Sequence, residues 1–564
     1  MKRILVLLVA LTLLIGCCSA VSETEELEMS DIPGMTAAGV LPIVTEPVTI
    51  TIGMAMQNNV IDYDTNWYTQ YVKEQTGIDI EFFFLPSEDA ATKLDMMISA
   101  GDKLPDIILE YTTDSLFYYG SLGYYLPMND YFDEYAYYWY QSMEYATELE
   151  KTLTNQVMYA YDGNIYAFPN TSANISADGE NLMYINQQWL DNLGLEMPTT
   201  LDEFYDVLVA FRDGDPNGNG IADEIPLVGY NSYDRRGDVV GDLINAFTYY
   251  PYDYAERTNN FRMVVNDGEV STAVIQEEYR EALRFMKKLY DEKLLSPLSF
   301  SQTDVELKAM VDRPAGEDTI VGCMGLNATS GGKGLYNASD EYPKALEYAA
   351  LPCLIGPEGV QYAARQATSY SYSIVITKDC ENPEVAFRLL DWFSGPETSI
   401  TARYGEKDVD WKWAEEGDID SNGNPALFTV LGGNSYWGAD AQNKLWRALS
   451  GYMFTTYMGY TAKPQPTMYQ EHVANMFNDA MIMRDGKQPE EVYLLPSYNE
   501  DEQKVIDAYA RNLTNLSNEW RTMFIIGEKN LDDDWNTYID ALEEAHMSEV
   551  LAAGQSCYTR MNQN

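Results

Sequence analysis

Histidine is almost absent from this chain, and its scarcity excludes several common kinds of catalytic centre. Among 564 residues only His472 and His546 occur, and no second histidine stands four residues after His472, as a zinc protease would require. The sequence has no G-x-S-x-G segment for a serine nucleophile and no G-x-x-x-x-G-K-[ST] loop for phosphates. The 88 acidic residues guarantee accidental carboxylate pairs, but nothing singles out one pair for glycoside cleavage. We therefore expect a protein that is not an enzyme.

Basic residues are few relative to acidic ones. The chain has 36 Lys and Arg against 88 Asp and Glu, which gives a formal net charge of −52. Such a surface repels nucleic acid and anionic lipid headgroups, so we expect neither as a partner. The hydrophobic fraction of 46% is that of a globular protein, and 564 residues are too many for one ordinary core. The length favours two large lobes with insertions, and we expect a monomer.

No apolar run reaches the length of a membrane-spanning helix, which argues against a pore. The apolar segment at residues 4–15 follows the basic pair Lys2-Arg3, a pattern typical of a secretory signal peptide. The segment Leu14-Ile-Gly-Cys17 is similar to the lipobox of bacterial lipoproteins, which implies cleavage after Gly16 and a diacylglycerol on Cys17. The alternative is a plain signal peptide in which this cysteine occurs by chance.

The lipobox interpretation fixes expectations for the first 45 residues. We expect residues 1–16 to be a lipoprotein signal peptide and residues 17–45 to be the lipidated cysteine followed by a flexible tether, because this stretch is polar and poor in aromatic residues. Lipid chains such as palmitate would then hold the protein on the extracellular face of the bacterial cytoplasmic membrane. Contact with the membrane is expected through this anchor only.

Cysteine is also rare, and its spacing supports no zinc or dithiol site. Apart from Cys17, the cysteines form no C-x-x-C pair: Cys18, Cys323, Cys353, Cys380 and Cys557. We expect buried free thiols rather than a disulfide framework. The sequence leaves open a single bridge between Cys323 and Cys353.

One loop, residues 213–227, carries side chains that dictate a ligand. Oxygen-bearing side chains recur along it: Asp215, Asn217, Asn219 and Asp223. With Gly220 at the point of a sharp turn, this pattern is that of the first half of an EF-hand calcium loop. The twelfth position is Pro226, which has no ligating side chain, so Asp223 or Glu224 must close the coordination shell. The alternative is a turn-rich loop without a metal.

The sequence around this loop resembles a known family. Asp-Pro-Asn-Gly-Asn-Gly-Ile-Ala-Asp-Glu-Ile-Pro-Leu at residues 215–227, together with residues 189–195 and 198–204, is similar to the extracellular solute-binding proteins, family 1, of bacterial ABC importers. The resemblance is to the large lipoprotein and alginate-binding branch, and it extends over essentially the whole chain. It implies a structural Ca²⁺ with these ligands: the side chains of Asp215, Asn217, Asn219, Asp223 and Glu224 and the carbonyl of Ile221.

Alternating strands and helices after the tether predict a parallel α/β sheet. Residues 48–52, 78–85 and 106–109 are strand-like, with helical patterns between them. Together with the resemblance, this order predicts a periplasmic-binding-protein-like type II fold, in which two α/β lobes are joined by a hinge and enclose a ligand cleft. We expect the hinge at residues 126 and 352. The expected lobes are residues 46–126 with 353–395, and residues 127–352 with 396–564, the second lobe containing the calcium loop at 213–227.

Ligands of open α/β sheets bind outside the carboxyl ends of the strands. This rule points to Gln57 and Asn58 after the first strand and to Tyr111 and Asp114 after the third. Aromatic rings suit the faces of sugars, whose hydroxyls meet polar side chains. Further candidates stand in expected loops and element ends: Arg365, Tyr404, Glu406, Trp411, Tyr436 and Trp437.

These observations predict a substrate-binding lipoprotein of an ABC importer. It would capture an extracellular solute, an oligosaccharide by class, through hinge closure and deliver it to the transmembrane permease subunits. The alternative is a secreted carbohydrate-active enzyme, either a glycoside hydrolase or a polysaccharide lyase. A peptide or lipid binder on the same scaffold is a third alternative.

Overall fold

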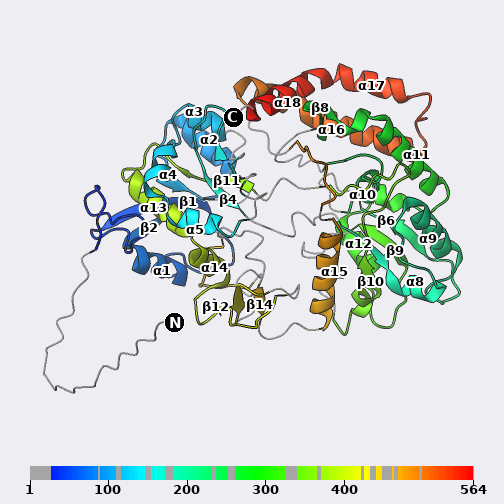
Figure 1. Ribbon diagram of the computed structural model, residues 1–564, viewed down its shortest axis with the longest axis horizontal. Coiled ribbons are helices and arrows are strands. Elements are labelled where there is room, and N and C mark those ends of the chain that lie inside the picture. The colour runs from blue at the N-terminus through cyan, green and yellow to red at the C-terminus, as the bar shows by residue number, and fades with distance from the viewer. Residues whose placement is uncertain are drawn as a thin grey trace, which may run out of the picture.

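The computed structural model contains two α/β bodies, which we call the first and the second lobe (Figure 1). Each lobe has its own sheet and its own buried apolar cluster, so the expectation of two α/β lobes is confirmed. The structure describes residues 27–86, 89–109, 116–146, 151, 154–155, 158–171, 182–230, 237–251, 261–325, 339–364, 370–420, 425–431, 440–447, 460–462, 468–484, 486–493 and 498–562.

A five-stranded sheet forms the centre of the first lobe. Its strand order is β2 (Ile78–Leu85), β1 (Val48–Ala55), β3 (Ile107–Ile108), β11 (Tyr370–Ile376) and β4 (Phe168–Thr171). As predicted, β1 is parallel to β2 and to β3, whereas β11 is antiparallel to both of its neighbours. The helices of this lobe are α1 (Trp67–Thr76), α2 (Ala90–Ala100), α3 (Leu116–Ser121), α4 (Asn129–Tyr135), α5 (Tyr138–Met143), α13 (Pro383–Ser394) and α14 (Pro396–Tyr404).

The second lobe is built on a four-stranded sheet in the order β10 (Tyr348–Ala350), β5 (Met183–Asn186), β9 (Val321–Gly325) and β6 (Ile225–Val228). A separate hairpin of β7 (Met263–Asn266) and β8 (Glu269–Thr272) packs against the last helix of the chain. Its α-helices are α8 (Gln187–Leu193), α9 (Leu201–Asp213), α10 (Val239–Ile244), α11 (Glu277–Asp291), α12 (Asp304–Val311), α15 (Met468–Arg484), α16 (Glu500–Ile526), α17 (Trp535–Glu544) and α18 (Met547–Met561). Three short 3₁₀ turns are η1 (Ala273–Ile275), η2 (Pro297–Phe300) and η3 (Pro343–Glu347).

Helix α9 leads into the candidate calcium loop, and its sequence explains where it begins. The Thr200 hydroxyl accepts the Glu203 N–H, and the Glu203 carboxylate accepts the Thr200 N–H, which completes a capping box. One face of the helix is fully packed, with Phe204, Leu208 and Phe211 buried against the second-lobe core. This apolar stripe fixes the direction in which the chain enters residues 213–227.

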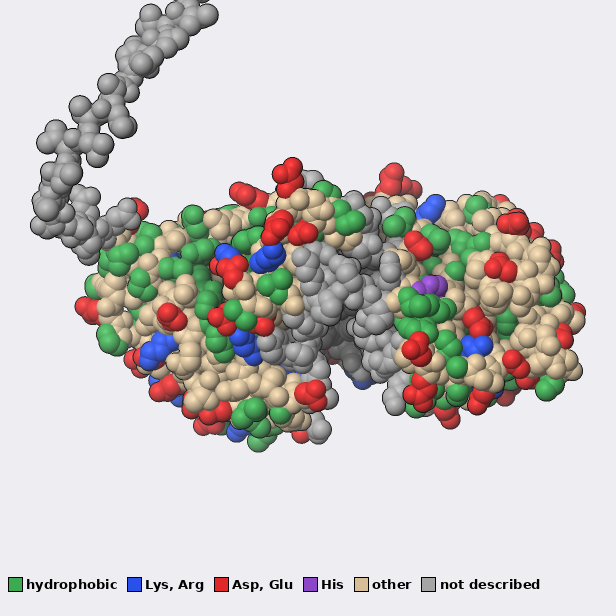
Figure 2. All heavy atoms as spheres, turned by 90° about the horizontal axis from the view of Figure 1, so that it is seen from below, with side chains coloured by type: hydrophobic (Ala, Val, Ile, Leu, Met, Phe, Trp, Pro, Cys, Tyr) green, Lys and Arg blue, Asp and Glu red, His purple; other side chains and the backbone are tan. Residues whose placement is uncertain are grey.

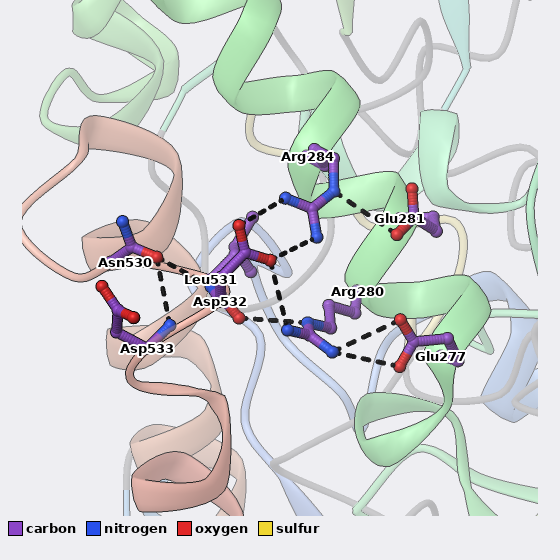
Figure 3. Close-up of polar contacts among 8 residues, drawn as sticks. All are labelled: Glu277, Arg280, Glu281, Arg284, Asn530, Leu531, Asp532 and Asp533. Carbon is purple, nitrogen blue, oxygen red and sulfur yellow. Dashed lines mark hydrogen bonds and ion pairs between the residues drawn. The ribbon is translucent and has the colours of Figure 1, made fainter.

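The C-terminal helices are fastened to α11 by one ion-pair cluster. Asp532, between α16 and α17, accepts from Arg280 at 3.3 Å and from Arg284 at 2.9 Å (Figure 3). The Arg280 guanidinium also donates to the Leu531 carbonyl at 3.0 Å. Although α16 is 27 residues long, no helix in the described ranges is both long and apolar enough to span a membrane.

Two segments assigned to the second lobe by the sequence analysis pack in the first. Helices α4 and α5 lie against α13, and β4 pairs with β11, so residues 129–143 and 168–171 extend the first lobe beyond residue 126. The described residues 396–420, 425–431 and 440–447 also return to this lobe, where the Trp446 indole donates to the Thr69 hydroxyl at 2.7 Å. The reason is that α13 is buried along its whole length and needs covering helices on several sides.

The crossings between lobes therefore differ from the expected hinge positions. Leu126 donates its N–H to the Ile376 carbonyl at 2.9 Å, inside the first lobe, and Leu351 donates to the Met183 carbonyl, inside the second. The chain instead passes between the lobes within residues 172–181, 365–369 and 463–467, and these three links lie outside the described residues.

A small sheet of the first lobe is not among the strands predicted from the sequence. It consists of β12 (Trp411–Trp413), β13 (Phe428–Val430) and β14 (Tyr460–Ala462). Each strand is three residues long, too short for a period-two pattern to be recognised in the sequence. Local patterns in the sequence therefore do not indicate this sheet.

The segment 27–45 is docked on the first lobe, so the expectation of a flexible tether over residues 17–45 is wrong for this part. Met35 and Ile43 are fully buried in the first-lobe core. The buried Arg388 guanidinium of α13 donates to the Thr36 carbonyl at 2.7 Å and to the Val40 carbonyl at 3.2 Å. A few apolar side chains in a polar segment are thus enough to fix it.

Candidate solute-binding site and calcium loop

The carboxyl ends of the strands define one edge of the first sheet. The parallel strands β1 and β3 end there, at Ala55 and Ile108. The antiparallel strand β11 begins at the same edge, where Tyr370 pairs with Thr171 at the end of β4. Two of the links to the second lobe, residues 172–181 and 365–369, adjoin this edge. The carboxyl edge of the first sheet is therefore the edge that adjoins the second lobe.

The second sheet has the same polarity. The parallel strands β6 and β9 end together, at Val228 and Gly325, and Gly325 pairs with Met183 at the start of β5. Strand β10 ends at this edge as well, because Ala350 pairs with Tyr184. The carboxyl edges of both sheets thus lie on the side of the links between the lobes, and the described parts of the two lobes stand apart in Figure 2. Open α/β sheets bind ligands at this edge.

Gln57 and Asn58 stand directly after β1, at the carboxyl edge of the first sheet. Gln57 is half-buried and its N–H donates to the Tyr63 hydroxyl at 3.0 Å, while Asn58 is exposed. The placement expected from the sequence is therefore found for both residues, and their contact with a solute stays a prediction. Five further candidates lie outside the described residues: Tyr111, Asp114, Arg365, Tyr436 and Trp437.

Three later candidates are used in packing within the first lobe, contrary to the expectation that they face a cleft. Trp411 is 0% exposed, and its indole N–H donates to the Gly405 carbonyl at 3.0 Å. Tyr404 is 4% exposed, and its ring lies 5.2 Å from that of Phe428. Glu406 is half-buried and pairs with Lys444 at 2.8 Å. The sheet of β12, β13 and β14, which the sequence did not predict, explains the difference. The rings of Tyr404 and Trp411 are buried in the apolar cluster of this sheet.

A small cavity that the sequence analysis does not predict lies at the carboxyl edge of the second sheet. Its free volume is about 40 Å³. The polar or reactive groups in its lining are Asp242, Asn245, Cys353, Tyr362 and Arg484. They come from α10, from the segment after β10 and from the end of α15, and no spacing in the sequence links them. The cavity collects a carboxylate, an amide and a guanidinium at the predicted ligand edge.

The loop at residues 213–227 brings its oxygen-bearing side chains together. The amide nitrogens of Asn217 and Asn219 lie 3.4 Å and 3.3 Å from one oxygen of Asp223. The Asp215 carboxylate accepts the Gly220 N–H at 3.1 Å. Gly220 has φ +74°, so the sharp turn predicted at this glycine is found. The loop therefore folds back on itself and gathers these side chains around Asp223 and Asp215.

The electrostatics of the loop fit a cation. One carboxylate oxygen of Glu224 is buried and has no hydrogen-bond partner. Burial, followed by the nearby carboxylates of Asp223 and Asp215, raises the pKa of Glu224. Within the described ranges no three His, Cys, Asp or Glu side chains form a metal cluster on their own, so the Asn amide oxygens and the Ile221 carbonyl would have to complete any coordination shell.

The loop is also tied to its surroundings in a way that would transmit cation binding. Asn192 of α8 donates to the Pro216 carbonyl at 2.8 Å, and Asn217 donates to the Thr319 carbonyl at 3.1 Å. The last three residues of the loop already belong to β6, which begins at Ile225. A cation here would stabilise the junction between α9, β6 and the approach to β9.

The cysteines and histidines have structural surroundings. Cys323 is buried in β9 and Cys353 lines the cavity, and both are free thiols, so the bridge left open by the sequence is not formed. His472 Nε2 lies 3.0 Å from the Tyr348 carbonyl, and the exposed His546 pairs with Glu549. Cys17 lies outside the described residues.

Comparison with known proteins decides the family. Residues 57–400, more than half of the chain, match the family described as bacterial extracellular solute-binding protein. The chain belongs to this family. Its two-lobed architecture is that of a solute-binding protein, as the resemblance in the sequence implied.

Two relatives of known name align with most of this chain. The fructooligosaccharide ABC transporter substrate-binding protein FusA of Streptococcus pneumoniae is 26% identical over 508 residues, which are 88% of this chain and 87% of FusA. Lipoprotein LipO of Bacillus subtilis is 24% identical over 480 residues, 82% of this chain and 83% of LipO.

Solved structures share the fold. A FusA EF-hand mutant in complex with fructo-nystose has a TM-score of 0.64 at 23% identity and covers 92% of this chain and 100% of its own. A structure from Bifidobacterium longum infantis, described as an HMO binding ABC-transporter associated solute binding protein, has a TM-score of 0.72 at 17% identity. It covers 91% of this chain and 99% of its own. The predicted type II two-lobed fold is confirmed.

Proposed function

We propose that this solute-binding protein captures an extracellular oligosaccharide between its lobes and delivers it to the transmembrane subunits of an ABC importer. The observation that carries the proposal is that both sheets present their carboxyl edges toward the other lobe, where ligands of open α/β sheets bind. The substrate class is supported by FusA, which carries a fructooligosaccharide name and aligns over most of both chains.

The proposed mechanism is closure of the lobes around the sugar. A ligand that contacts both edges stabilises the closed state by its higher affinity for that state, and the permease then recognises it. The amides of Gln57 and Asn58 would contact hydroxyls from the first lobe. We propose further contacts from Tyr111, Asp114, Arg365, Tyr436 and Trp437.

Binding without turnover is the decisive test. The purified protein is incubated with pools of oligosaccharides, and thermal unfolding and product release are measured together. At a ligand concentration of about 100 times Kd we expect a stabilisation of about 2.7 kcal/mol and no product. Release of cleaved sugar would instead identify the alternative, a carbohydrate-active enzyme.

The first-lobe contacts have a matched control. The double variant Gln57→Ala, Asn58→Ala should lose most of the ligand-induced shift, whereas Gln188→Ala, at an exposed position on α8, should keep it. An unchanged shift in the double variant would remove these two residues from the site.

We also propose that the loop at residues 213–227 holds a structural Ca²⁺, with Asp215, Asn217, Asn219, Ile221, Asp223 and Glu224 as ligands. The buried unpartnered oxygen of Glu224 and its carboxylate neighbours support this assignment. When bound, the cation would neutralise the clustered carboxylates and stabilise the second lobe. Its role is structural rather than chemical.

Chelation tests the calcium proposal. We expect EDTA to lower the melting temperature of the wild type by several degrees, because a ligand of the folded state stabilises it by mass action. Asp215→Ala should melt at the chelated value with or without EDTA, and Asp202→Ala, at an exposed position on α9, should respond like the wild type. A wild type whose melting is indifferent to EDTA would remove the metal from the loop.

Cys17 is proposed as the lipid anchor. Because residues 27–45 are docked on the first lobe, residues 18–26 would form the spacer, with a reach of at most about 30 Å when extended. Metabolic labelling with a palmitate analogue should mark the wild type and Cys18→Ala but not Cys17→Ala. Labelling that survives in Cys17→Ala would reject the anchor.

A further inference from the structure

We infer that Phe84, at the carboxyl end of β2, packs its ring against a second glycosyl unit of the bound sugar, beside the unit that Gln57 and Asn58 contact. This inference rests on the proposed function and specifies its substrate class. A protein with this contact selects chains of at least two glycosyl units over monosaccharides. Phe84 has no distinguishing signature in the sequence, because it ends a run of three phenylalanines that is typical of a buried strand.

The position of Phe84 in the first sheet is that of a neighbouring subsite. Strands β1 and β2 are parallel, and Phe84 pairs with Met54, one residue before β1 ends at Ala55. Gln57 and Asn58 follow β1, and β2 is the outer strand on this side of the sheet, so Phe84 stands one strand further out. Neighbouring strands lie about 4.8 Å apart, a spacing comparable with the size of one sugar ring. The two positions therefore match adjacent units of one sugar chain.

A row of aromatic rings fixes the ring of Phe84. Phe82 and Phe84 project from the same face of β2, as residues two apart in a strand do, and their rings lie 5.8 Å apart with an interplanar angle of 8°. Phe82 in turn lies 5.3 Å from the buried ring of Trp446. The ring of Tyr63 lies 4.9 Å from that of Phe84. Because these neighbours already hold the ring, Phe84 loses little freedom when a ligand binds.

The same tyrosine connects Phe84 to the candidate residue Gln57. The Tyr63 hydroxyl accepts the Gln57 N–H at 3.0 Å and donates to the Trp446 carbonyl at 3.2 Å. Tyr63 is only 6% exposed, so the aromatic core of the first lobe holds it in place. Gln57 and Phe84 are therefore positioned by one shared support at the ligand edge.

The ring of Phe84 is packed and yet accessible. Phe84 is 41% exposed, and Met56, directly after β1, is 49% exposed. The structure describes the whole of this edge, residues 54–63 and 82–86. An aromatic ring attracts the C–H face of a sugar, whereas the candidate amides of the preceding strand can bond to hydroxyls. The edge thus offers one unit of a chain its hydrogen bonds and the next unit an apolar surface.

Calorimetry with sugars of defined length tests the inference. The probes are gluco-, manno-, galacto- and fructo-oligosaccharides, each as a series from the monosaccharide to the tetrasaccharide. In the series that binds most tightly, we expect the affinity of the wild type to rise with chain length by about tenfold or more, as covering part of an aromatic side chain allows. Phe84→Ala should abolish this rise and leave the affinity for the monosaccharide unchanged.

Three further variants separate ring packing from simple apolar volume. Phe84→Tyr keeps the flat ring and should keep the rise of affinity with length. Phe84→Leu keeps an apolar side chain without a flat face and should lose most of the rise. Met96→Ala, at an exposed apolar position on α2, should bind every length like the wild type. If the monosaccharide binds too weakly to measure, Phe84→Tyr and Phe84→Leu are compared on the shortest chain that binds.

The outcomes separate this inference from the proposed function. Equal weakening of every length in Phe84→Ala would mean that the substitution acts through Tyr63 and Gln57, and the inference would be overturned. Wild-type binding of longer chains by Phe84→Ala or by Phe84→Leu would overturn it as well, and oligosaccharide capture would stand. If Phe84→Ala does not fold, the contrast between Phe84→Tyr and Phe84→Leu decides. Absence of binding to any of these sugars by the wild type would overturn the proposed function and the inference together.

Discussion

The two lobes both hold distant segments of chain with buried charges, but the partners of those charges differ. In the first lobe, Arg388 and Asp391 of α13 are 0% exposed and bind backbone groups. Arg388 donates to carbonyls of the segment 27–45. The Asp391 carboxylate accepts the N–H groups of Tyr137, Tyr138 and Trp139 at the start of α5. One helix therefore fixes two segments that flank it.

In the second lobe the corresponding connection is made between side chains. Asp238 at the start of α10 accepts from Arg521 of α16 at 2.8 Å. Burial by itself would raise the pKa of Asp238, but Arg521 and Arg262 hold it below its usual value. This ion pair attaches α16 to α10 within the second lobe.

The difference teaches where each lobe is vulnerable. Backbone dipoles are present whatever the sequence of the held segment, so the contacts of Arg388 and Asp391 depend on few side chains. An ion pair depends on both of its members, because removal of one leaves the other buried without a countercharge. We therefore expect the second lobe to be the more sensitive to single substitutions at its charged junction.

The largest effect is expected from Asp238→Ala. It removes the countercharge of Arg521 and the cap on the Gly241 N–H, and it should lower the free energy of unfolding by about 3–5 kcal/mol. Urea denaturation followed by tryptophan fluorescence measures the change. Asp238→Asn, which can keep the cap, should lose less. A loss below about 1 kcal/mol in Asp238→Ala would erase the contrast between the lobes.

An intermediate effect is expected in the pH dependence of the first lobe. Burial raises the pKa of Asp391 to about 6, against the lowering effect of its three backbone donors and of Arg388. The folded state then holds more protons than the unfolded state between about pH 4 and pH 6, so the contribution of this group to stability falls as pH rises through that window. The fall amounts to roughly 3 kcal/mol and levels off above about pH 6.

Asp391→Asn isolates this contribution, because it removes the titrating group. Urea denaturation of the wild type and the variant across the window should give curves whose difference changes with pH by that amount. The many other carboxylates cancel in the difference. Parallel curves would mean that Asp391 titrates in the folded protein as it does in the unfolded chain.

The smallest effect is expected at the surface. Asp532 pairs with Arg280 and Arg284 (Figure 3), but its side chain is 66% exposed. Asp532→Ala should therefore cost less than about 1 kcal/mol in urea denaturation, and added salt should shrink the cost further. A loss of stability comparable to that of Asp238→Ala would show that solvent exposure does not make the Asp532 cluster weaker than the Asp238–Arg521 pair.

Much of the local structure and part of the site could be predicted from the sequence. Strand β2, the capping box of Thr200 and Glu203, and the turn at Gly220 follow from periodicity and residue chemistry within a few neighbours. Gln57 and Asn58 were placed by a rule that needs only the order of strands and helices. Trp411 was wrongly predicted to contact the ligand. An aromatic residue near the end of an element has the same sequence pattern whether its ring packs in the core or binds a sugar.

By itself the sequence determined the types of the main elements, the oxygen-rich loop and the family, because these depend on short-range patterns that survive without neighbours. Only the tertiary structure decided that residues 27–45 dock, that residues 129–143 and 168–171 extend the first sheet's lobe, and that Asp242 meets Arg484. These features join segments far apart in the chain. Their pairing depends on which buried surfaces match in shape and charge, and that matching is settled only when the whole chain packs.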